Sequence, residues 1–195
     1  MAAVLQHNET YQLRIYAGNS QVHNQVVSFD DTQAAYVLPS PTPAPRPLYF
    51  RPAPPSPCSP NPYTTLVVVQ SPSSPPPTNP QLLALQGPAG KAEYRIVALD
   101  DPTPQGIGAS ILYDEWRVVE NGGRILLRYG EDPSGLNHWI LAKRSWGWIL
   151  WWYEPTAANM EDLGEYVMVD VEVEARGAYS SEPTTTRPKD AAIVS

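Results

Sequence analysis

Proline is concentrated in one stretch of this chain, and that concentration limits what the chain can fold into. Seventeen of the 23 prolines lie between Pro39 and Pro88. Proline has no backbone N–H to donate to a sheet or a helix, so a stretch this rich in proline is typical of extended polyproline II or disordered chain. We therefore predict that residues 39–91 form a proline-rich, largely disordered insertion, and that the rest of the 195-residue chain builds the core.

One apolar segment interrupts the proline-rich stretch. Residues 64–70, Thr-Thr-Leu-Val-Val-Val-Gln, are uncharged and rich in β-branched side chains. Such a segment would aggregate if it were left exposed. We expect this island to pack on the folded body as a strand, so that the proline-rich residues are loops inserted within one domain.

The chain on both sides of the insertion has the pattern of β-strands. Residues 9–16 and 165–175 alternate apolar and polar side chains, which is the period of a half-buried strand. Asn121-Gly122 stands between two apolar runs and predicts a hairpin, and a second hairpin is expected near Ser145. These segments predict an all-β chain.

The predicted organisation is a single antiparallel β domain. Its first strands lie in residues 1–38 and its main part in residues 92–178, and residues 179–195 are expected to be a disordered tail. Successive antiparallel hairpins can assemble into a β-trefoil or into a small barrel or sandwich of hairpins.

Two hairpin units share a spacing of aromatic, glycine and aliphatic residues. They contain Trp116, Gly123, Ile125 and Tyr129, and then Trp139, Gly147, Ile149 and Tyr153. This spacing resembles the hairpin pattern of β-trefoil proteins, which include ricin-B-type lectins and fungal trefoil protease inhibitors. The resemblance implies a trefoil fold and, as its most specific role, inhibition of a protease by an exposed loop. The Gln-x-Trp signature of the lectins is absent, because Trp116 follows Asp-Glu and Trp139 follows Asn-His.

The charge and the single cysteine limit the expected partners and location. The formal net charge is −7, and an acidic surface repels phosphate groups, so we expect neither nucleic acid nor an anionic membrane as a partner. Cys58 alone cannot form an internal disulfide, and the N-terminal residues lack the apolar run of a secretory signal. We therefore expect a cytoplasmic location.

All six tryptophans lie between Trp116 and Trp152, four of them within residues 146–152. In a straight strand Trp148 and Trp152 point to one face and Trp151 to the other. We assign Trp151 to the core, as the apolar partner of the valine-rich strand near the C-terminus. Trp146, Trp148 and Trp152 then form a candidate surface that binds a protein or a glycan. The alternative is a strand buried on both faces.

A short motif in the proline-rich stretch suggests a second kind of partner. Arg51, Pro54 and Pro57 fit R-x-x-P-x-x-P, a ligand pattern in which a preformed polyproline II helix fills the aromatic groove of an SH3 domain. The interpretation is an adaptor that recruits SH3-like domains. The alternative is a spacer without a partner.

Catalytic motifs are not found in this sequence. The three histidines are far apart, and Cys58 has no neighbouring base to activate it. We therefore predict no catalytic residue, no metal site and no cofactor. The favoured function is a non-catalytic binding protein, either a trefoil-type protease inhibitor or a carbohydrate- or protein-binding module. The alternatives are the SH3-recruiting adaptor and an enzyme of unknown type.

Overall fold

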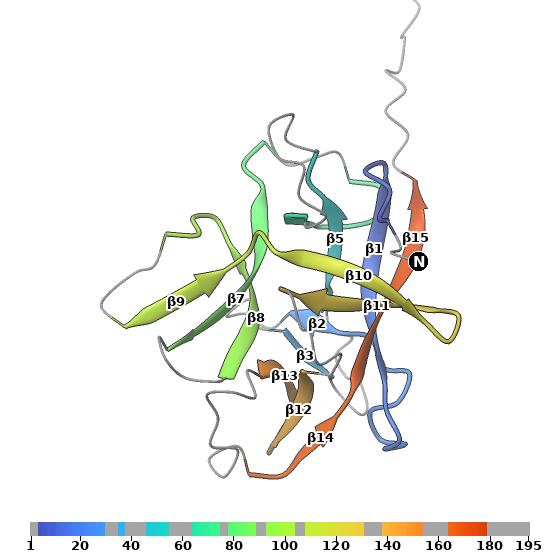
Figure 1. The fold of residues 1–195 in the computed structure, drawn as a ribbon, viewed down its shortest axis with the longest axis vertical. Coiled ribbons are helices and arrows are strands. Elements are labelled where there is room, and N and C mark those ends of the chain that lie inside the picture. Colours follow the sequence, from blue (N-terminus) through green and yellow to red (C-terminus); the bar gives the residue numbers. More distant parts are fainter. Residues whose placement is uncertain are drawn as a thin grey trace, which may run out of the picture.

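The computed structural model describes nine segments of the chain. They are residues 4–29, 35–37, 46–54, 64–74, 78–88, 93–103, 108–130, 138–153 and 164–178. Within these segments the chain forms strands and turns and no helix, so the all-β prediction is confirmed (Figure 1). All of the strands pair in the antiparallel sense in one continuous, strongly curved sheet.

The strands are numbered in the order in which they follow one another along the chain. They are β1 (Glu9–Tyr16), β2 (Ser28–Phe29), β3 (Ala35–Val37), β4 (Arg46–Pro47), β5 (Tyr49–Pro52), β6 (Leu66–Val69), β7 (Gln81–Pro88), β8 (Glu93–Leu99), β9 (Ala109–Leu112), β10 (Trp116–Asn121), β11 (Arg124–Tyr129), β12 (Trp139–Arg144), β13 (Gly147–Tyr153), β14 (Tyr166–Met168) and β15 (Asp170–Ala178).

Six of these strands pair in a closed ring. β1 pairs with both β15 and β5, β5 pairs with β6, and β11 pairs with both β10 and β15. The last junction, between β6 and β10, is an isolated bridge at Thr64 and Trp116. There the Thr64 N–H donates to the Trp116 carbonyl at 2.7 Å, and the Trp116 N–H donates back at 3.2 Å. The ring therefore joins both ends of the chain to its middle.

The remaining strands pair beside the ring. β2 pairs with β3, β7 with β8, and β12 with β13. A short strand then adds to the first member of each pair: β4 to β2, β9 to β7, and β14 to β12. β3 and β8 both pair with β13, along the edge that does not pair with β12. The three hairpins therefore meet at β13.

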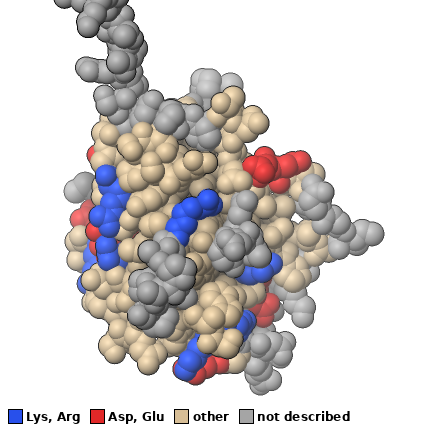
Figure 2. Space-filling model, turned by 180° about the vertical axis from the view of Figure 1, so that it is seen from behind, with Lys and Arg blue, Asp and Glu red and all other residues tan. Residues whose placement is uncertain are grey.

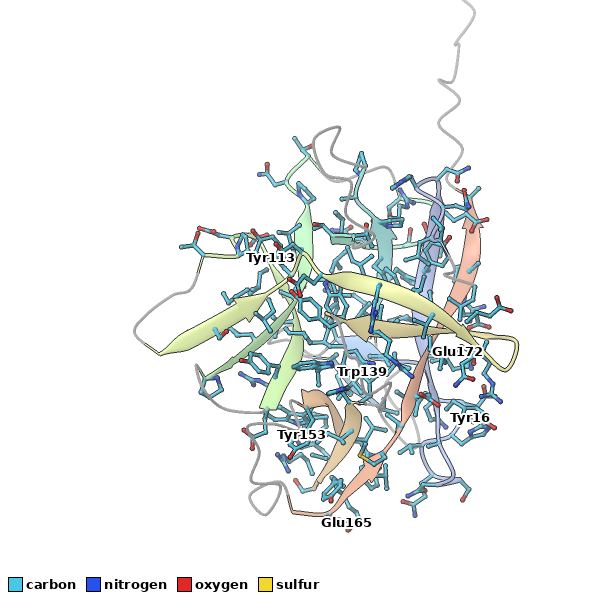
Figure 3. All side chains as sticks on the ribbon, viewed as in Figure 1. Tyr16, Tyr113, Trp139, Tyr153, Glu165 and Glu172 are labelled. Atoms are coloured by element: carbon cyan, nitrogen blue, oxygen red, sulfur yellow. The ribbon has the colours of Figure 1, made fainter. Side chains whose placement is uncertain are left out.

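Two tryptophans fill the centre of the core. The indoles of Trp116 and Trp139 are fully buried and lie parallel, with ring centroids 6.4 Å apart and an interplanar angle of 3°. Trp139 lies in the middle of the molecule (Figure 3). Each indole N–H is satisfied, since Trp116 donates to the Leu83 carbonyl at 2.9 Å and Trp139 to the Leu127 carbonyl at 2.8 Å. A buried indole needs such an acceptor, so these bonds fix both rings to the strands around them.

The hairpin signals in the sequence are confirmed, with one small shift. The turn between β10 and β11 consists of Gly122 and Gly123, both with positive φ (58° and 78°), one residue later than the predicted Asn-Gly pair. Two residues with positive φ form the tight turn whose twist matches that of the flanking strands. The β12–β13 hairpin turns at Ser145 and Trp146, as expected.

The prediction of a largely disordered insertion over residues 39–91 is wrong for β4, β5 and β7, which lie inside it. Phe50 and Leu83 are fully buried there. The physical reason is that proline is sparse within the long strands: β5 and β7 each contain a single proline, at the last residue of the strand, where it does little harm to the ladder. The island is confirmed as β6. Residues 38–45, 55–63, 75–77 and 89–92 and the tail over 179–195 lie outside the described residues.

Two buried tyrosines make the fold sensitive to alkaline pH. Burial raises the pKa of Tyr11 to about 12; the Gln6 N–H that donates to its hydroxyl opposes this, and the hydrogen bond to Glu9 and its negative charge add to it. Burial, together with the charge of Asp114, also raises the pKa of Tyr129.

We expect the free energy of unfolding to fall as the pH rises above about 10. A tyrosine in the unfolded chain ionises near pH ~10, so the stabilisation is complete below that pH and is lost toward the folded pKa of about 12. Urea denaturation at each pH measures the effect. The Tyr11→Phe variant should lose part of this pH dependence, whereas Tyr16→Phe, at an exposed tyrosine, should keep it. Equal pH dependence in all three proteins would contradict the assignment.

Candidate binding surface

The sequence pattern predicted the wrong inward face for the tryptophan-rich strand β13. Trp148 and Trp152 are 2% and 7% exposed and belong to the main core cluster, whereas Trp151 is half-buried outside it. The assignment of Trp148 and Trp152 to an exposed surface, and of Trp151 to the core, is therefore wrong. Of the predicted surface residues, Trp146 is exposed, at 50%.

The pairing of the C-terminal strand explains this reversal. The valine alternation of β15 does find an apolar partner, but that partner is β1, where Leu13 lies opposite Val173 and Ile15 opposite Val171. Strand β13 is instead the meeting point of the three hairpins. There Trp152 packs edge-on against Tyr94, with ring centroids 5.8 Å apart, and stacks on His138 at 5.3 Å.

The outward side of this region carries a cluster of large apolar side chains, which we call the aromatic face. It comprises Tyr36, Trp146, Ile149, Trp151, Tyr166 and Met168. Two rows of cross-strand neighbours bring most of its members together: Tyr166–Ala142–Ile149–Tyr36 and Met168–Ile140–Trp151–Arg95. Ala142 and Ile140 are themselves fully buried. The rows run across β14, β12 and β13 to β3 and β8, so the face joins segments that are far apart in the sequence.

Trp146 is the most exposed aromatic side chain of the face. It lies at the tip of the β12–β13 turn, and its indole meets the ring of Tyr36 edge-on, with centroids 5.5 Å apart and an interplanar angle of 76°. Such aromatic pairs stabilise the geometry of both rings. Trp146 is therefore held in position by the hairpin and by Tyr36, although half of its surface is open to solvent.

Charged side chains border the aromatic face. The Lys143 ammonium lies 2.8 Å from a Glu165 carboxylate oxygen and 5.7 Å from the ring centroid of Trp148, and the Arg95 guanidinium lies 5.9 Å from that of Trp151. The Trp151 Nε1 atom is buried and has no hydrogen-bond partner among the described residues. On the side of the molecule seen in Figure 2, basic and acidic side chains form small separate groups on a mostly uncharged surface.

Tyr36, Tyr166 and Met168 were not among the predicted surface residues. The sequence contains a partial signal, because Tyr166 and Met168 alternate with Val167 and point away from the valine side of that segment. The sequence pattern does not predict that β14 pairs with β12 or that β3 pairs with β13. Only that pairing brings these side chains beside Trp146 and Trp151.

The proposed SH3-binding arginine is part of the core structure. Arg51 is 6% exposed in β5, and its guanidinium donates to the Thr10 hydroxyl at 2.7 Å and to the carbonyls of Pro72 and Ser74 at 2.9 and 3.0 Å. An arginine held in this way cannot meet the acidic rim of an SH3 domain, so the assignment of Arg51 to that motif is wrong. Pro54 is exposed, and Pro57 lies outside the described residues.

Among the described residues, no group of three or more His, Cys, Asp or Glu side chains is placed to hold a metal ion. No helix in the described part of the chain is long and apolar enough to cross a membrane. Comparisons of the chain with models of protein families, with curated proteins and with solved structures find no match.

The reversed assignment of the tryptophans gives a direct mutational prediction. Replacing the buried Trp148 with alanine should lower the free energy of unfolding by about 3–5 kcal/mol, because a large cavity remains in the core. The same change at Trp146, two residues earlier, should cost less than about 1 kcal/mol. Denaturant unfolding measures both values. Equal losses in the two variants would contradict the assignment of faces.

The buried arginine gives a second prediction. Arg51→Ala leaves the Thr10 hydroxyl and two backbone carbonyls without their charged donor, so the free energy of unfolding should fall by about 2–3 kcal/mol. Arg46→Ala, at an exposed arginine on β4, should change it by less than about 0.5 kcal/mol. Thermal and chemical denaturation of both variants provide the test. Two equally small effects would show that Arg51 contributes little to the structure.

Proposed function

We propose that this chain is a non-catalytic binding protein of β-trefoil architecture, and that its aromatic face docks on a protein partner. The exposure of Trp146 beside Tyr36, in a surface otherwise made of Ile149, Trp151, Tyr166 and Met168, is the observation that carries the proposal. The more specific role that we propose is inhibition of a protease, in which the β12–β13 turn enters the substrate cleft.

A threefold recurrence in the strand pairing supports the trefoil assignment. The strands fall into three successive groups, β1–β5, β6–β10 and β11–β15. In each group the first and last strands belong to the ring, the second and third form a hairpin, and the fourth pairs with the second. The third strands, β3, β8 and β13, come together where the hairpins meet. This arrangement agrees with the resemblance of the tryptophan hairpins to trefoil proteins.

The composition of the aromatic face favours a protein over a glycan. Tryptophan, tyrosine and methionine are enriched in the cores of protein interfaces, and a few such residues carry most of the binding energy. Inside the face, the cross-strand neighbour of Tyr36 is the partly exposed Ile149, whereas Ile140, the neighbour of Trp151, is fully buried beneath it. Aliphatic neighbours provide apolar contact but no hydrogen bonds to sugar hydroxyls.

The position of Trp146 favours insertion into a cleft. It lies on a two-residue turn whose flanking strands pair from Trp139–Trp152 to Arg144–Gly147. At the base of the turn, Lys143 forms an ion pair with Glu165, the residue that precedes β14. A turn already held by its neighbours loses little conformational entropy on binding, which is an advantage for an inhibitor.

Titration of the full chain against one papain-like cysteine protease and one trypsin-like serine protease tests the proposal. We expect inhibition of at least one of them. Trp146→Ala should weaken the inhibition about 30-fold, the equivalent of a ~2 kcal/mol hot spot, while lowering the free energy of unfolding by less than about 1 kcal/mol. Val4→Ala is the control, because Val4 is exposed but is not part of the aromatic face.

The other outcomes separate the parts of the proposal. Failure to inhibit either protease would contradict the inhibitor role. Inhibition that is equal in Trp146→Ala and in the unmodified chain would place the contact outside the aromatic face. Binding to a glycan array that is lost in Trp146→Ala would replace the protein partner with a carbohydrate.

A further inference from the structure

Strand β9 has an unprotected edge. It pairs with β7 along one side, from Leu85–Leu112 to Pro88–Ala109, and along the other side it pairs with no described strand. Successive residues of an antiparallel strand direct their N–H and C=O groups to alternate sides. Half of the backbone polar groups of β9 therefore face away from the sheet. Figure 1 shows β9 at the side of the molecule, with its first residues far from the ring strands.

The strands in the equivalent places carry protection that β9 lacks. β4 contains Arg46 and Pro47, and β14 is preceded by the charged Glu165 and leads after one residue into β15. Charges and prolines on an edge strand are two usual means of preventing edge-to-edge pairing. The sequence from Gln105 to Tyr113 contains neither a charged residue nor a proline.

We propose that β9 is a self-association site, along which two copies of this chain pair in the antiparallel sense about a twofold axis. Such pairing joins β8, β7 and β9 of each copy into one sheet, and the same surface serves both copies. The occupant is a second copy because the edge is electrically neutral. It therefore meets its own image without local repulsion, although the chain as a whole carries a net charge of −7. Ile111 lies on the cross-strand row that contains Trp151, three strands away through Arg95 and Gln86, and the inference does not depend on the proposed function.

The length of the edge sets the expected strength of the contact. β9 has four residues, all of them half-buried, so the strand pairing alone buries much less than the ~1,200 Å² of a stable interface. We therefore expect a weak dimer that dissociates on dilution. Ile111 lies in one cross-strand row with Gln86 and the exposed Arg95, so its side chain is on the outward face and close to the seam.

Sedimentation velocity of the full chain over a wide concentration range tests the inference. We expect the mass to rise from monomer to dimer with concentration. Ile111→Lys places two like charges at the seam. It should weaken the dimer and raise its dissociation constant at least tenfold. Ile125→Lys, the same change at an exposed isoleucine of β11, should leave it unchanged. Ser110→Lys is the second variant, to be used if Ile111→Lys does not fold.

Hydrogen exchange of the amides of β9 gives an independent readout. Alternate amides of residues 109–112 should gain protection as the concentration rises. A monomeric mass at every concentration would overturn the inference, as would a dimer that Ile111→Lys and Ser110→Lys both leave intact. Protection of the outer amides at all concentrations in a monomer would show that the chain covers this edge itself, which would also overturn it.

Discussion

The backbone hydrogen bonds between Thr64 and Trp116 close the ring of strands around the core. Trp116 does more than complete this junction, because its side chain donates to Leu83 and stacks on Trp139, which in turn donates to Leu127. One residue thus links the ring strands β6 and β10 to β7, and through Trp139 to β11 and β12. The packing of the hairpins against the ring depends on this set of contacts, and the position of the aromatic face depends on the hairpins.

Local pattern was sufficient for the class of the fold and for the turns. The alternation in β1 and β15, the glycines between β10 and β11, and the valine-rich island of β6 each reflect a preference that acts over a few residues. The direction in which β13 faces depends instead on long-range pairing. A period of two defines two faces of Trp148, Trp151 and Trp152, but only the contacts with β3 and β8 determine which face lies inside.

Arg51 shows the same limit for a short motif. Its spacing to Pro54 and Pro57 is a property of seven residues, whereas its environment is formed by Thr10, Pro72 and Ser74, which are distant in the sequence. A buried guanidinium is tolerated when polar groups satisfy its donors. The arginine whose spacing fits an SH3 ligand makes its contacts within the protein, where it joins β5 to β1 and to the loop that follows β6.

The pairing of the first strand with the last has a consequence for how the protein is made. β1 finds its longest partner in β15, where residues 9–16 lie opposite residues 170–178. During synthesis, most of the chain leaves the ribosome before β15 has been made. Until then Leu13 and Ile15 lack the strand that pairs beside them. Contacts between such distant residues slow folding and prolong the time in which unpaired strands can aggregate. Pairing of β1 along this edge is therefore completed only after β15 has been synthesised.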